Sequence, residues 1–339
     1  MKLIYFLYRA VRVFFSAALT MVGLLFVTFL IGRIMPIDPV LATIGDHASE
    51  ETYAAVRQQM GLDEPIYVQL WLYFGQVLRG DLGVSSLTQN PVTHDLLNYF
   101  PATFELATVA TVLGVLCGIP MGVVAAANRG RWVDHIVRMI SVFGYSMPIF
   151  WLGMMGLMIL YAELGWVAGP GRLDIFYDGL VPKVTGALLI DSLLAGNLQV
   201  FFNACSHIAL PAALLGYFSA AYITRMTRTF MIDQLAQDYI LAARARGIGE
   251  KCLLWKHALG NALIPLITVI ALSYGGLLEG SVLTETVFAW PGLGLYLTNA
   301  LLSADMNAVL GATIVIGLVF LFLNLLSDLL YAKIDPRVT

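Results

Sequence analysis

The chain has 339 residues, of which 59% are hydrophobic and only 12% are charged, with a formal net charge of -3. This charged share is about half that of an average soluble domain, too small to cover a surface that faces water. Cys117, Cys205 and Cys252 have no metal-type spacing and lie too far apart to suggest a disulfide framework, so the sequence indicates no redox role.

The apolar residues are gathered in six long blocks. A hydrocarbon core about 30 Å thick is crossed by roughly 20 helical residues, and each block is near that length. The blocks cover residues 11–32, 102–127, 136–162, 207–224, 262–283 and 307–331. The sequence therefore predicts an all-α integral membrane protein with six transmembrane helices. A cleaved signal peptide is the alternative for the first block, which is longer than a usual signal sequence and is followed by no A-x-A-like site.

The basic residues predict the orientation of these helices, because segments that stay in the cytoplasm keep Lys and Arg. An arrangement with both termini inside places most basic residues in the cytoplasm and only these on the outside: Arg33, Arg57, Arg79, Arg172 and Lys183. The outer loops carry acidic residues instead. The opposite topology is disfavoured.

This topology divides the chain into three parts. Residues 1–34 form the first transmembrane helix with its cytoplasmic N-terminus, residues 35–100 a large external loop or subdomain, and residues 101–339 a five-helix core. The core includes a cytoplasmic loop, residues 225–261, between the fourth and fifth helices.

The external loop has helix signals of its own. Ser49 is placed to cap a helix that ends at Gly61, and a second helix is expected from Asp63 to Gly80, with Pro65 in its first turn. Two interpretations remain open for this loop: a small external domain or lid, and a packed loop that braces the helix bundle.

The cytoplasmic loop is long for a connector and rich in basic residues. Residues 238–247 are expected to form a short helix whose small side chains, Ala242 and Ala243 among them, allow close approach, and Gly247 is expected to end it in a left-handed turn. A second helix is predicted over residues 249–259. Two short helices joined by this bend form a compact knob that suits a groove in a cytoplasmic partner. A solvated basic loop that only enforces orientation is the alternative.

The same loop resembles the EAA motif of ATP-binding-cassette (ABC) importer permeases, in the form found in the peptide, opine and nickel subgroup. The resemblance lies in the runs at residues 238–247 and 257–265, where Gly260 replaces an expected Arg. Further similar motifs span nearly the whole chain: Gly61-Leu62-Asp63-Glu64-Pro65, Gly80-Asp81-Leu82-Gly83, Ser146-Met147-Pro148, Arg225-Met226-Thr227-Arg228, Thr284-Glu285 and Phe288-Ala289-Trp290-Pro291-Gly292. The chain departs from the pattern at Pro36-Ile37-Asp38-Pro39 and around Asp305.

The resemblance implies a permease of the dipeptide/oligopeptide permease B type in the bacterial cytoplasmic (inner) membrane. It implies a transport role as one half of a heterodimeric pore, with a second permease subunit, two cytoplasmic ATPase subunits and an external solute-binding protein as partners. It also implies that the residues that couple the pore to the ATPases are Ala242, Ala243, Gly247, His257 and Asn261.

The sequence predicts a non-catalytic subunit. It contains no G-x-x-x-x-G-K-[ST] phosphate loop, so no cofactor is expected in this chain, and ATP and Mg are expected on the partner ATPases. The dispersed histidines indicate no metal site, and no nucleic-acid partner is expected. The substrate stays open among dipeptides, longer peptides, opines, sugars and nickel chelates.

Glu279 and Glu105 are acidic residues within predicted spans, where a charge is expensive unless it faces water or a partner. Glu279, between glycines near the outer end of the fifth span, is a candidate pore-lining residue for a peptide's amino group. A helix-end acid at the interface is the alternative interpretation.

Two other classes of function stay open. A self-contained secondary transporter is expected to have two similar halves, and no internal repeat is evident. An integral-membrane enzyme is expected to have convergent catalytic residues near a span end, and none of the usual constellations is present.

Overall fold

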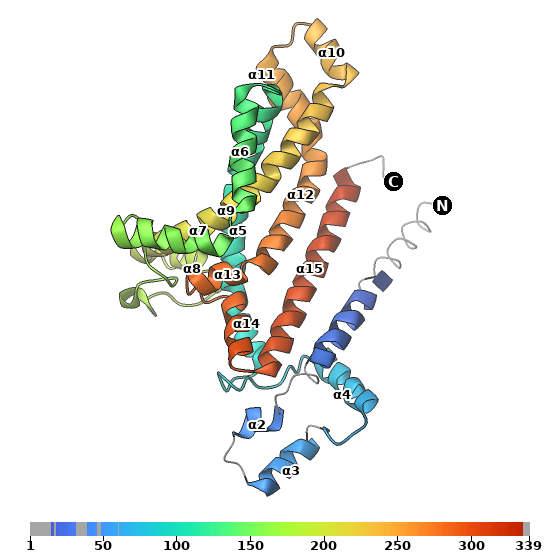
Figure 1. Ribbon diagram of the computed structural model, residues 1–339, viewed down its shortest axis with the longest axis vertical. Coiled ribbons are helices and arrows are strands. Elements are labelled where there is room, and N and C mark those ends of the chain that lie inside the picture. The colour runs from blue at the N-terminus through green and yellow to red at the C-terminus, as the bar shows by residue number, and fades with distance from the viewer. Residues whose placement is uncertain (1–14, 17, 32–38, 46–48, 60, 335–339) are drawn as a thin grey trace. The chain divides into compact units, whose positions relative to one another are not determined.

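The computed structural model describes residues 15–16, 18–31, 39–45, 49–59 and 61–334. The start of the first predicted span, the Pro36-Ile37-Asp38 part of the external motif and both predicted cytoplasmic termini lie outside these residues. Every regular element in the described ranges is a helix (Figure 1), and a single bridge between Val84 and Pro91 is the β-type pairing found among them.

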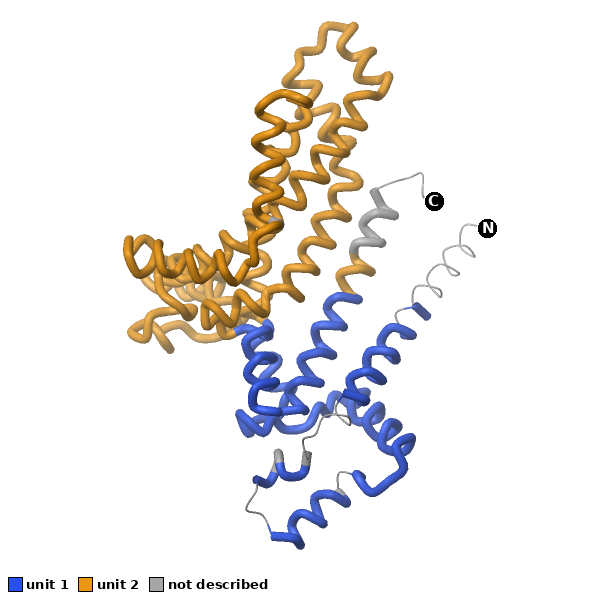
Figure 2. The backbone as a smooth tube through the Cα atoms, viewed as in Figure 1, with its two compact units in different colours: residues 1–100, 292–321 blue, residues 101–291, 322–339 orange. Residues whose placement is uncertain are grey.

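The chain forms two compact units (Figure 2). Unit 1 contains residues 1–100 and 292–321, and unit 2 contains residues 101–291 and 322–339. Two helices, α5 (Val92–Ala127) and α15 (Met306–Ile334), contribute residues to both units. The division into a first span, an external subdomain and a five-helix core stays a prediction, because these units are defined by contacts and not by a position in a bilayer.

Unit 1 joins the helix Ala18–Ile31 and the short helices of the predicted external loop to the region around α14. Its other helices are α2 (Pro39–Ile44), α3 (Glu50–Gln59), α4 (Ile66–Leu78) and α14 (Leu293–Leu302). Apolar side chains from α5, α14 and α15 form its core, including Val92, Tyr296 and Ala312. The buried Asp305 caps α15 through Ala308 N and accepts bonds from Ser85 Oγ and Leu87 N.

The two helices expected in the external loop are present. Ser49 Oγ accepts a hydrogen bond from Thr52 N at 3.2 Å, and α3 is followed by Gly61 at φ +65°. Pro65 is the N-cap of α4 and not part of its first turn, since its fixed φ and missing N–H suit a position before the first full turn. Whether this region acts as a lid or as a brace stays open.

Unit 2 is built around most of α5 and two long helical segments, Leu198–Leu235 and Glu250–Gly280, with several shorter elements. The elements after α5 are α6 (Trp132–Ser146), α7 (Ile149–Gly156), η1 (Leu157–Glu163), η2 (Ile175–Tyr177), α8 (Leu188–Leu194), α9 (Leu198–Leu235), α10 (Asp238–Ala245), α11 (Glu250–Cys252), η3 (Leu253–Ala258), α12 (Leu259–Gly280) and α13 (Val282–Val287). The fourth predicted span is the middle of α9, whose 38 residues make it about 57 Å long and longer than a bilayer core is thick.

Four helices in the described residues are long and apolar enough to cross a membrane, and a fifth crossing results if one bent pair is a single span. Ala18–Ile31 is a shorter apolar helix, and its expected N-terminal extension is outside the described residues. Six spans therefore stay a prediction.

The third predicted span, residues 136–162, is not one uninterrupted helix. Its halves are bent by 93°, with the break at Met147 and Pro148. Met147 has extended backbone angles because the ring of a following proline disfavours the helical conformation, and Pro148 cannot donate a helical hydrogen bond.

Three glycines on one face of α5 set its distance from α9. A Cβ at Gly114, Gly118 or Gly122 would lie within 3 Å of α9 side chains, the closest approach being 2.5 Å between Gly122 and the Cβ of Thr227. Spacing of four residues places the three glycines in one line along the helix. The two backbones are thus in close contact through small residues, a common way for helices to pack in membranes.

We expect Gly122→Val to destabilise unit 2, because the new side chain has no room at this contact. Overpacking of this kind costs about 1 to 3 kcal/mol. The thermal midpoint of the detergent-solubilised protein measures the effect.

Gly75→Val on α4 is the matched control, since a Cβ there meets no atom within 4 Å in the described part of the chain outside the backbone of its own helix. Equal midpoints for the two variants would contradict the close contact between α5 and α9.

Candidate functional site

The predicted coupling segment is a short helix followed by a glycine turn. The expected first helix is α10, and Gly247 has the expected left-handed backbone, at φ +79°. The predicted second helix is not a separate element: α11, η3 and α12 continue from Glu250 to Gly280 without a break. Between Glu250 and Pro265 the sequence contains no proline that would end the helix, and Pro265 itself lies inside α12.

The turn at Gly247 has the hydrogen bonds of a Schellman motif. Gly247 N donates to Arg244 O at 3.0 Å, and Ile248 N donates to Ala243 O at 3.2 Å. These bonds satisfy carbonyl groups left free at the end of α10, and they require a residue with positive φ at position 247. Apart from its two chain neighbours, no atom of the described residues lies within 4 Å of where a Cβ of residue 247 would be, so backbone strain alone favours glycine there.

The helix α10 is fixed to the ends of the long helices. Ile240 and Leu253 are fully buried in one apolar cluster with Met231 of α9 and Val123 of α5, and Ala243 and Ile248 pack against the same cluster. This cluster packs α10 against α5, α9 and α12.

The five predicted coupling residues fall into two sets. Ala242, Ala243 and Gly247 belong to α10 and its turn, where Ala242 and Gly247 are exposed and Ala243 is half-buried. His257, half-buried, lies on η3, and Asn261, exposed, lies four residues later in the first turn of α12.

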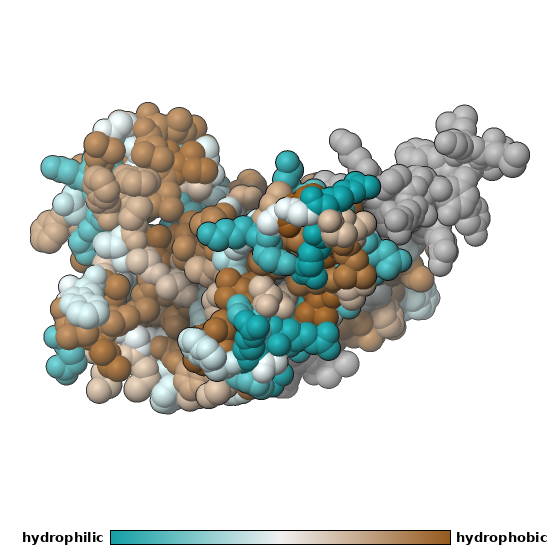
Figure 3. All heavy atoms as spheres, turned by 90° about the horizontal axis from the view of Figure 1, so that it is seen from above, coloured by the Kyte–Doolittle hydropathy of each residue, from teal (hydrophilic) through white to brown (hydrophobic). Residues whose placement is uncertain are grey.

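Charged side chains gather at this end of unit 2. In Figure 3, which looks onto the end that carries α10, hydrophilic residues lie over that end. Arg244 donates across the turn to the Glu250 carboxylate, with bonds of 2.7 and 3.1 Å, and this hydrogen bond to Glu250 raises the pKa of Arg244. Both side chains are about half exposed, so the ion pair contributes little to the free energy of unfolding, and its main effect is on the conformation of the turn.

A buried ion pair joins α6 to α9. Arg228 binds Asp134 through two bonds of 2.6 and 2.8 Å, and Gly130 N donates to the same carboxylate at 3.0 Å. Sequence analysis noted Arg228 as a position of family resemblance without a partner. The bidentate geometry makes this pair specific for arginine.

Glu279 lies at the end of α12 and is exposed. Within the described residues it makes no hydrogen bond or ion pair, and glycines 276 and 280 beside it have open space at their Cβ positions. A carboxylate on an apolar helix faces water or an opposite charge, because hydrocarbon does not solvate it.

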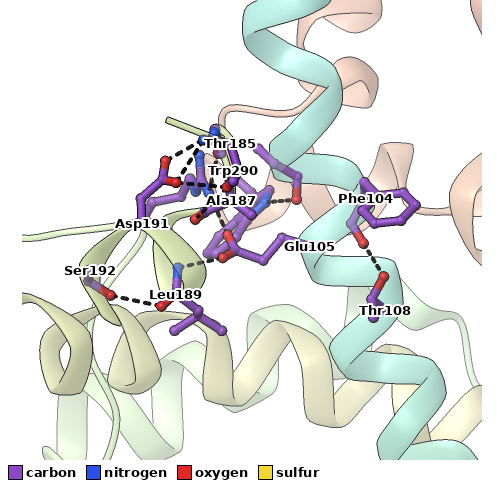
Figure 4. Close-up of polar contacts among 12 residues, drawn as sticks. Phe104, Glu105, Thr108, Thr185, Ala187, Leu189, Asp191, Ser192 and Trp290 are labelled. Carbon is purple, nitrogen blue, oxygen red and sulfur yellow. Dashed lines mark hydrogen bonds and ion pairs between the residues drawn. The ribbon is translucent and has the colours of Figure 1, made fainter. Parts of the chain in front are cut away.

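Glu105, the other acidic residue noted in a span, is in a different environment (Figure 4). It is 5% exposed, and it accepts hydrogen bonds from Arg172 and, at 2.6 Å, from Leu189 N. The guanidinium of Arg172 also donates to Gly186 O and lies 5.5 Å from the centre of the Trp290 ring. These contacts tie the segment between η1 and α9, through Arg172 and Leu189, to α5.

A second buried acid lies in the neighbouring segment. Glu285 on α13 is fully buried and accepts from Thr103 at 2.8 Å and Ser281 at 2.9 Å, while Trp290 Nε1 donates to Ala102 O at 2.9 Å. Glu285 and Trp290, both in the sequence motifs, thus hold α13 and the segment that follows it against α5.

The sequence matches the models of one family over nearly its whole length. Residues 118–339 match the model for the binding-protein-dependent transport system inner membrane component, and residues 3–107 match the corresponding N-terminal model. The chain belongs to this family. It is a permease subunit of an ABC importer and a multi-pass protein of the bacterial inner membrane.

Relatives cover the permease almost from end to end. It is 44% identical to a probable D,D-dipeptide transport system permease protein, DdpB, from Escherichia coli over 94% of both chains. It is 41% identical to a di/tripeptide transport system permease protein, DppB, from Pseudomonas aeruginosa, over 94% of this chain and 95% of the other.

A solved structure shares the fold. The MetNI methionine ABC transporter in an inward-facing conformation matches with a TM-score of 0.50 and 19% identity, over 70% of the permease and 93% of that chain. The helical architecture of the permease is thus that of an ABC importer subunit.

We expect Arg172→Gln to destabilise the permease more than Glu105→Gln/Arg172→Gln, since the single variant leaves the buried Glu105 carboxylate without its ion-pair partner. Removing one member of a buried pair costs about 3 to 5 kcal/mol. Thermal midpoints of the wild type, both single variants and the double variant give the interaction energy.

If the effects of the two single substitutions simply add, Glu105 and Arg172 do not interact as described.

Proposed function

We propose that the permease imports short peptides through a pore that it forms with a second, non-identical permease subunit. Relatives over nearly the whole chain are named as transporters of D,D-dipeptides, di- and tripeptides, and glutathione, the last with 34% identity in Salmonella choleraesuis. All three substrates are small peptides or peptide-like. Two cytoplasmic ATPases that bind ATP and Mg, and an external solute-binding protein, complete the proposed transporter.

The proposed topology has six spans with both termini in the cytoplasm. The distribution of basic residues supports it, and the hydrophilic end that carries α10 is then cytoplasmic. The loops that hold α3, α4 and α8 are then on the outer side, where a solute-binding protein docks.

The observation that carries the coupling proposal is the seating of α10. Ile240 anchors this helix in the core shared by α5, α9 and α12, while Ala242 on the same helix is exposed and small. A partner ATPase that grips the exposed face moves the three long helices with it. His257 and Asn261 are proposed to position the start of α12 against the same partner.

We expect Ala242→Trp to weaken the hold on the ATPase about tenfold or more, because a bulky ring on the docking face prevents close approach, and tenfold corresponds to about 1.4 kcal/mol. Gly247→Val should uncouple transport by straining the left-handed turn, at about 1 to 2 kcal/mol. Permease level, ATPase co-purification and peptide uptake are measured separately.

Ala54→Trp is the control for ATPase co-purification, since Ala54 is also exposed on a short helix but belongs to α3, which the proposed topology places on the outer side. Normal co-purification and normal uptake in both coupling variants would contradict the proposal and favour the alternative of a solvated basic loop.

Glu279 is proposed to line the pore and to attract the amino group of a peptide. We expect Glu279→Gln to raise the KM for a peptide with a free amino terminus about tenfold and to leave an N-acetylated peptide unaffected, because only the first carries the positive charge. Uptake into vesicles that contain the whole transporter measures both.

Glu163→Gln, at an exposed carboxylate on η1, is the matched control. Unchanged uptake of both peptides by an assembled Glu279→Gln transporter would favour a packing role at the helix end.

A further inference from the structure

The helix α4, in the predicted external loop, exposes a row of apolar side chains. Tyr67, Trp71, Phe74 and Leu78 follow one another at intervals of three or four residues, so they lie in one line along the helix. Tyr67, Trp71 and Leu78 are 71%, 80% and 82% exposed. Single exposed apolar residues are common on proteins, whereas a continuous row of them indicates a surface that contacts something other than water.

The polar side chains of α4 lie on the opposite side. Gln69 and Gln76 are about half a turn away from the row, and α4 contains no charged residue. Gln69 Nε2 donates to Leu62 O at 3.1 Å and to Glu64 O at 2.7 Å. The 13 residues of α4 make it about 20 Å long, too short to cross a hydrocarbon core about 30 Å thick. A short helix with one apolar and one polar side suits the plane of a membrane surface.

The helix α4 is attached to the end of another apolar helix. Tyr73 Oη and Thr28 Oγ1 are hydrogen-bonded at 3.3 Å, and the rings of Tyr73 and Phe29 lie 5.7 Å apart. Thr28 and Phe29 belong to the last turn of the helix Ala18–Ile31. The large side chains exposed on that helix are all apolar: Leu19, Val22, Phe26, Val27 and Ile31. The row on α4 therefore continues an exposed apolar surface.

This attachment lies at membrane depth. The helix that carries Thr28 packs beside α15, one of the helices able to span a membrane, since a Cβ at Gly317 would overlap Leu24. The two helices run in opposite directions within unit 1 (Figure 1). Gly317 is about 16 Å from Met306, where α15 begins, and Thr28 lies about 6 Å beyond Leu24 toward that end. The contact with Tyr73 is therefore roughly 10 Å inside the end of a membrane-spanning helix.

The neighbouring helix α3 shows what a water-facing helix of this loop is like. It carries Glu50, Glu51 and Arg57, and all three are exposed. On α4 the exposed row instead contains Tyr67 and Trp71, residue types that are enriched where a membrane meets water. Composition and depth together favour lipid over a protein partner as the surface that covers the row.

We propose that α4 is an interfacial anchor, whose row of Tyr67, Trp71, Phe74 and Leu78 inserts among phospholipid headgroups. The rings of tyrosine and tryptophan suit this position because each has an apolar body and a polar tip. The anchor holds the external loop against the bilayer surface. That the surface is the outer one rests on the proposed function, whereas the contact with lipid does not.

The test measures the depth of a spin label at Trp71→Cys. The full-chain permease, with Cys117, Cys205 and Cys252 replaced by serine, is placed in nanodiscs of phosphatidylcholine and phosphatidylglycerol. Power saturation compares the accessibility of the label to oxygen, which dissolves in lipid, and to a nickel chelate, which stays in water. We expect the label to be accessible to oxygen, shielded from nickel and about 5 to 10 Å below the phosphate groups.

Two further labels are the controls. A label at Gln76→Cys, on the opposite side of α4, and one at Ala54→Cys, exposed on α3, should both be accessible to nickel. Equal nickel accessibility at positions 71 and 54 would overturn the proposal. The measurement needs neither peptide nor ATPase, so this result would leave the proposed transport function standing.

A second arm separates lipid from a protein partner. The label at position 71 is measured again after the permease is purified with the second permease subunit, and after a solute-binding protein is added. We expect oxygen accessibility to persist in both complexes. Loss of accessibility to both reagents would mean that protein covers the row, which would contradict the anchor.

If the permease without native cysteines does not fold, quenching of tryptophan fluorescence by brominated phospholipids decides. We expect Trp71→Phe to reduce the intensity that these lipids quench, because Trp71 is among the tryptophans that they reach. An unchanged quenched intensity would place Trp71 away from lipid and refute the proposal.

Discussion

The close approach of α5 and α9 is the contact on which unit 2 depends. Because glycines 114, 118 and 122 hold no side chain between the two helices, α9 lies against α5 along several turns. The same helix α9 then packs against α6, α8 and α12 and leads into α10. A helix that packs against so many neighbours has little freedom to shift alone, so a shift at one of its contacts also alters the others.

Buried charges fix the elements that the glycine contact does not reach. Arg228 and Asp134 join α9 to α6, and Arg172 and Glu105 join the segment between η1 and α9 to α5. Glu285 accepts hydrogen bonds from two hydroxyl groups. Each carboxylate is nearly inaccessible, and each has its partner. Because an unpaired charge is very unfavourable in such places, these pairs select one arrangement of helices and loops over alternatives with similar apolar burial.

Sequence reasoning predicted the local features well, because their signals are local. The cap at Ser49, the end of α3 at Gly61 and the left-handed Gly247 follow from rules about single turns. Features that depend on distant residues were not predicted. Arg172 is 67 positions from Glu105, and Arg228 is 94 positions from Asp134, so no pattern pairs them.

Hydropathy also does not indicate where the axis of a helix changes direction. The block from 136 to 162 has the total apolar content of one span, yet Pro148 bends it, and the hydropathy signal continues through the bend. The continuity of the second coupling helix with α12 was not predicted, for a related reason. Polar residues were taken as the end of a helix, although this helix extends beyond its apolar region. The coupling residues themselves stay a prediction that the local geometry of α10 accommodates.

The continuity of α9 has a mechanical consequence. From His207, whose ring contacts Gly171 and Asp174 of the preceding loop, to Leu235, just before α10, the helix rises about 42 Å. Over that length a tilt of about 5° at one end displaces the other by roughly 4 Å, as follows from the helix rise alone. An angular change too small to separate side chains at the loop therefore becomes, at the other end, a displacement as large as a side chain. The helix acts as a lever arm, in which a small tilt at one end gives a larger displacement at the other.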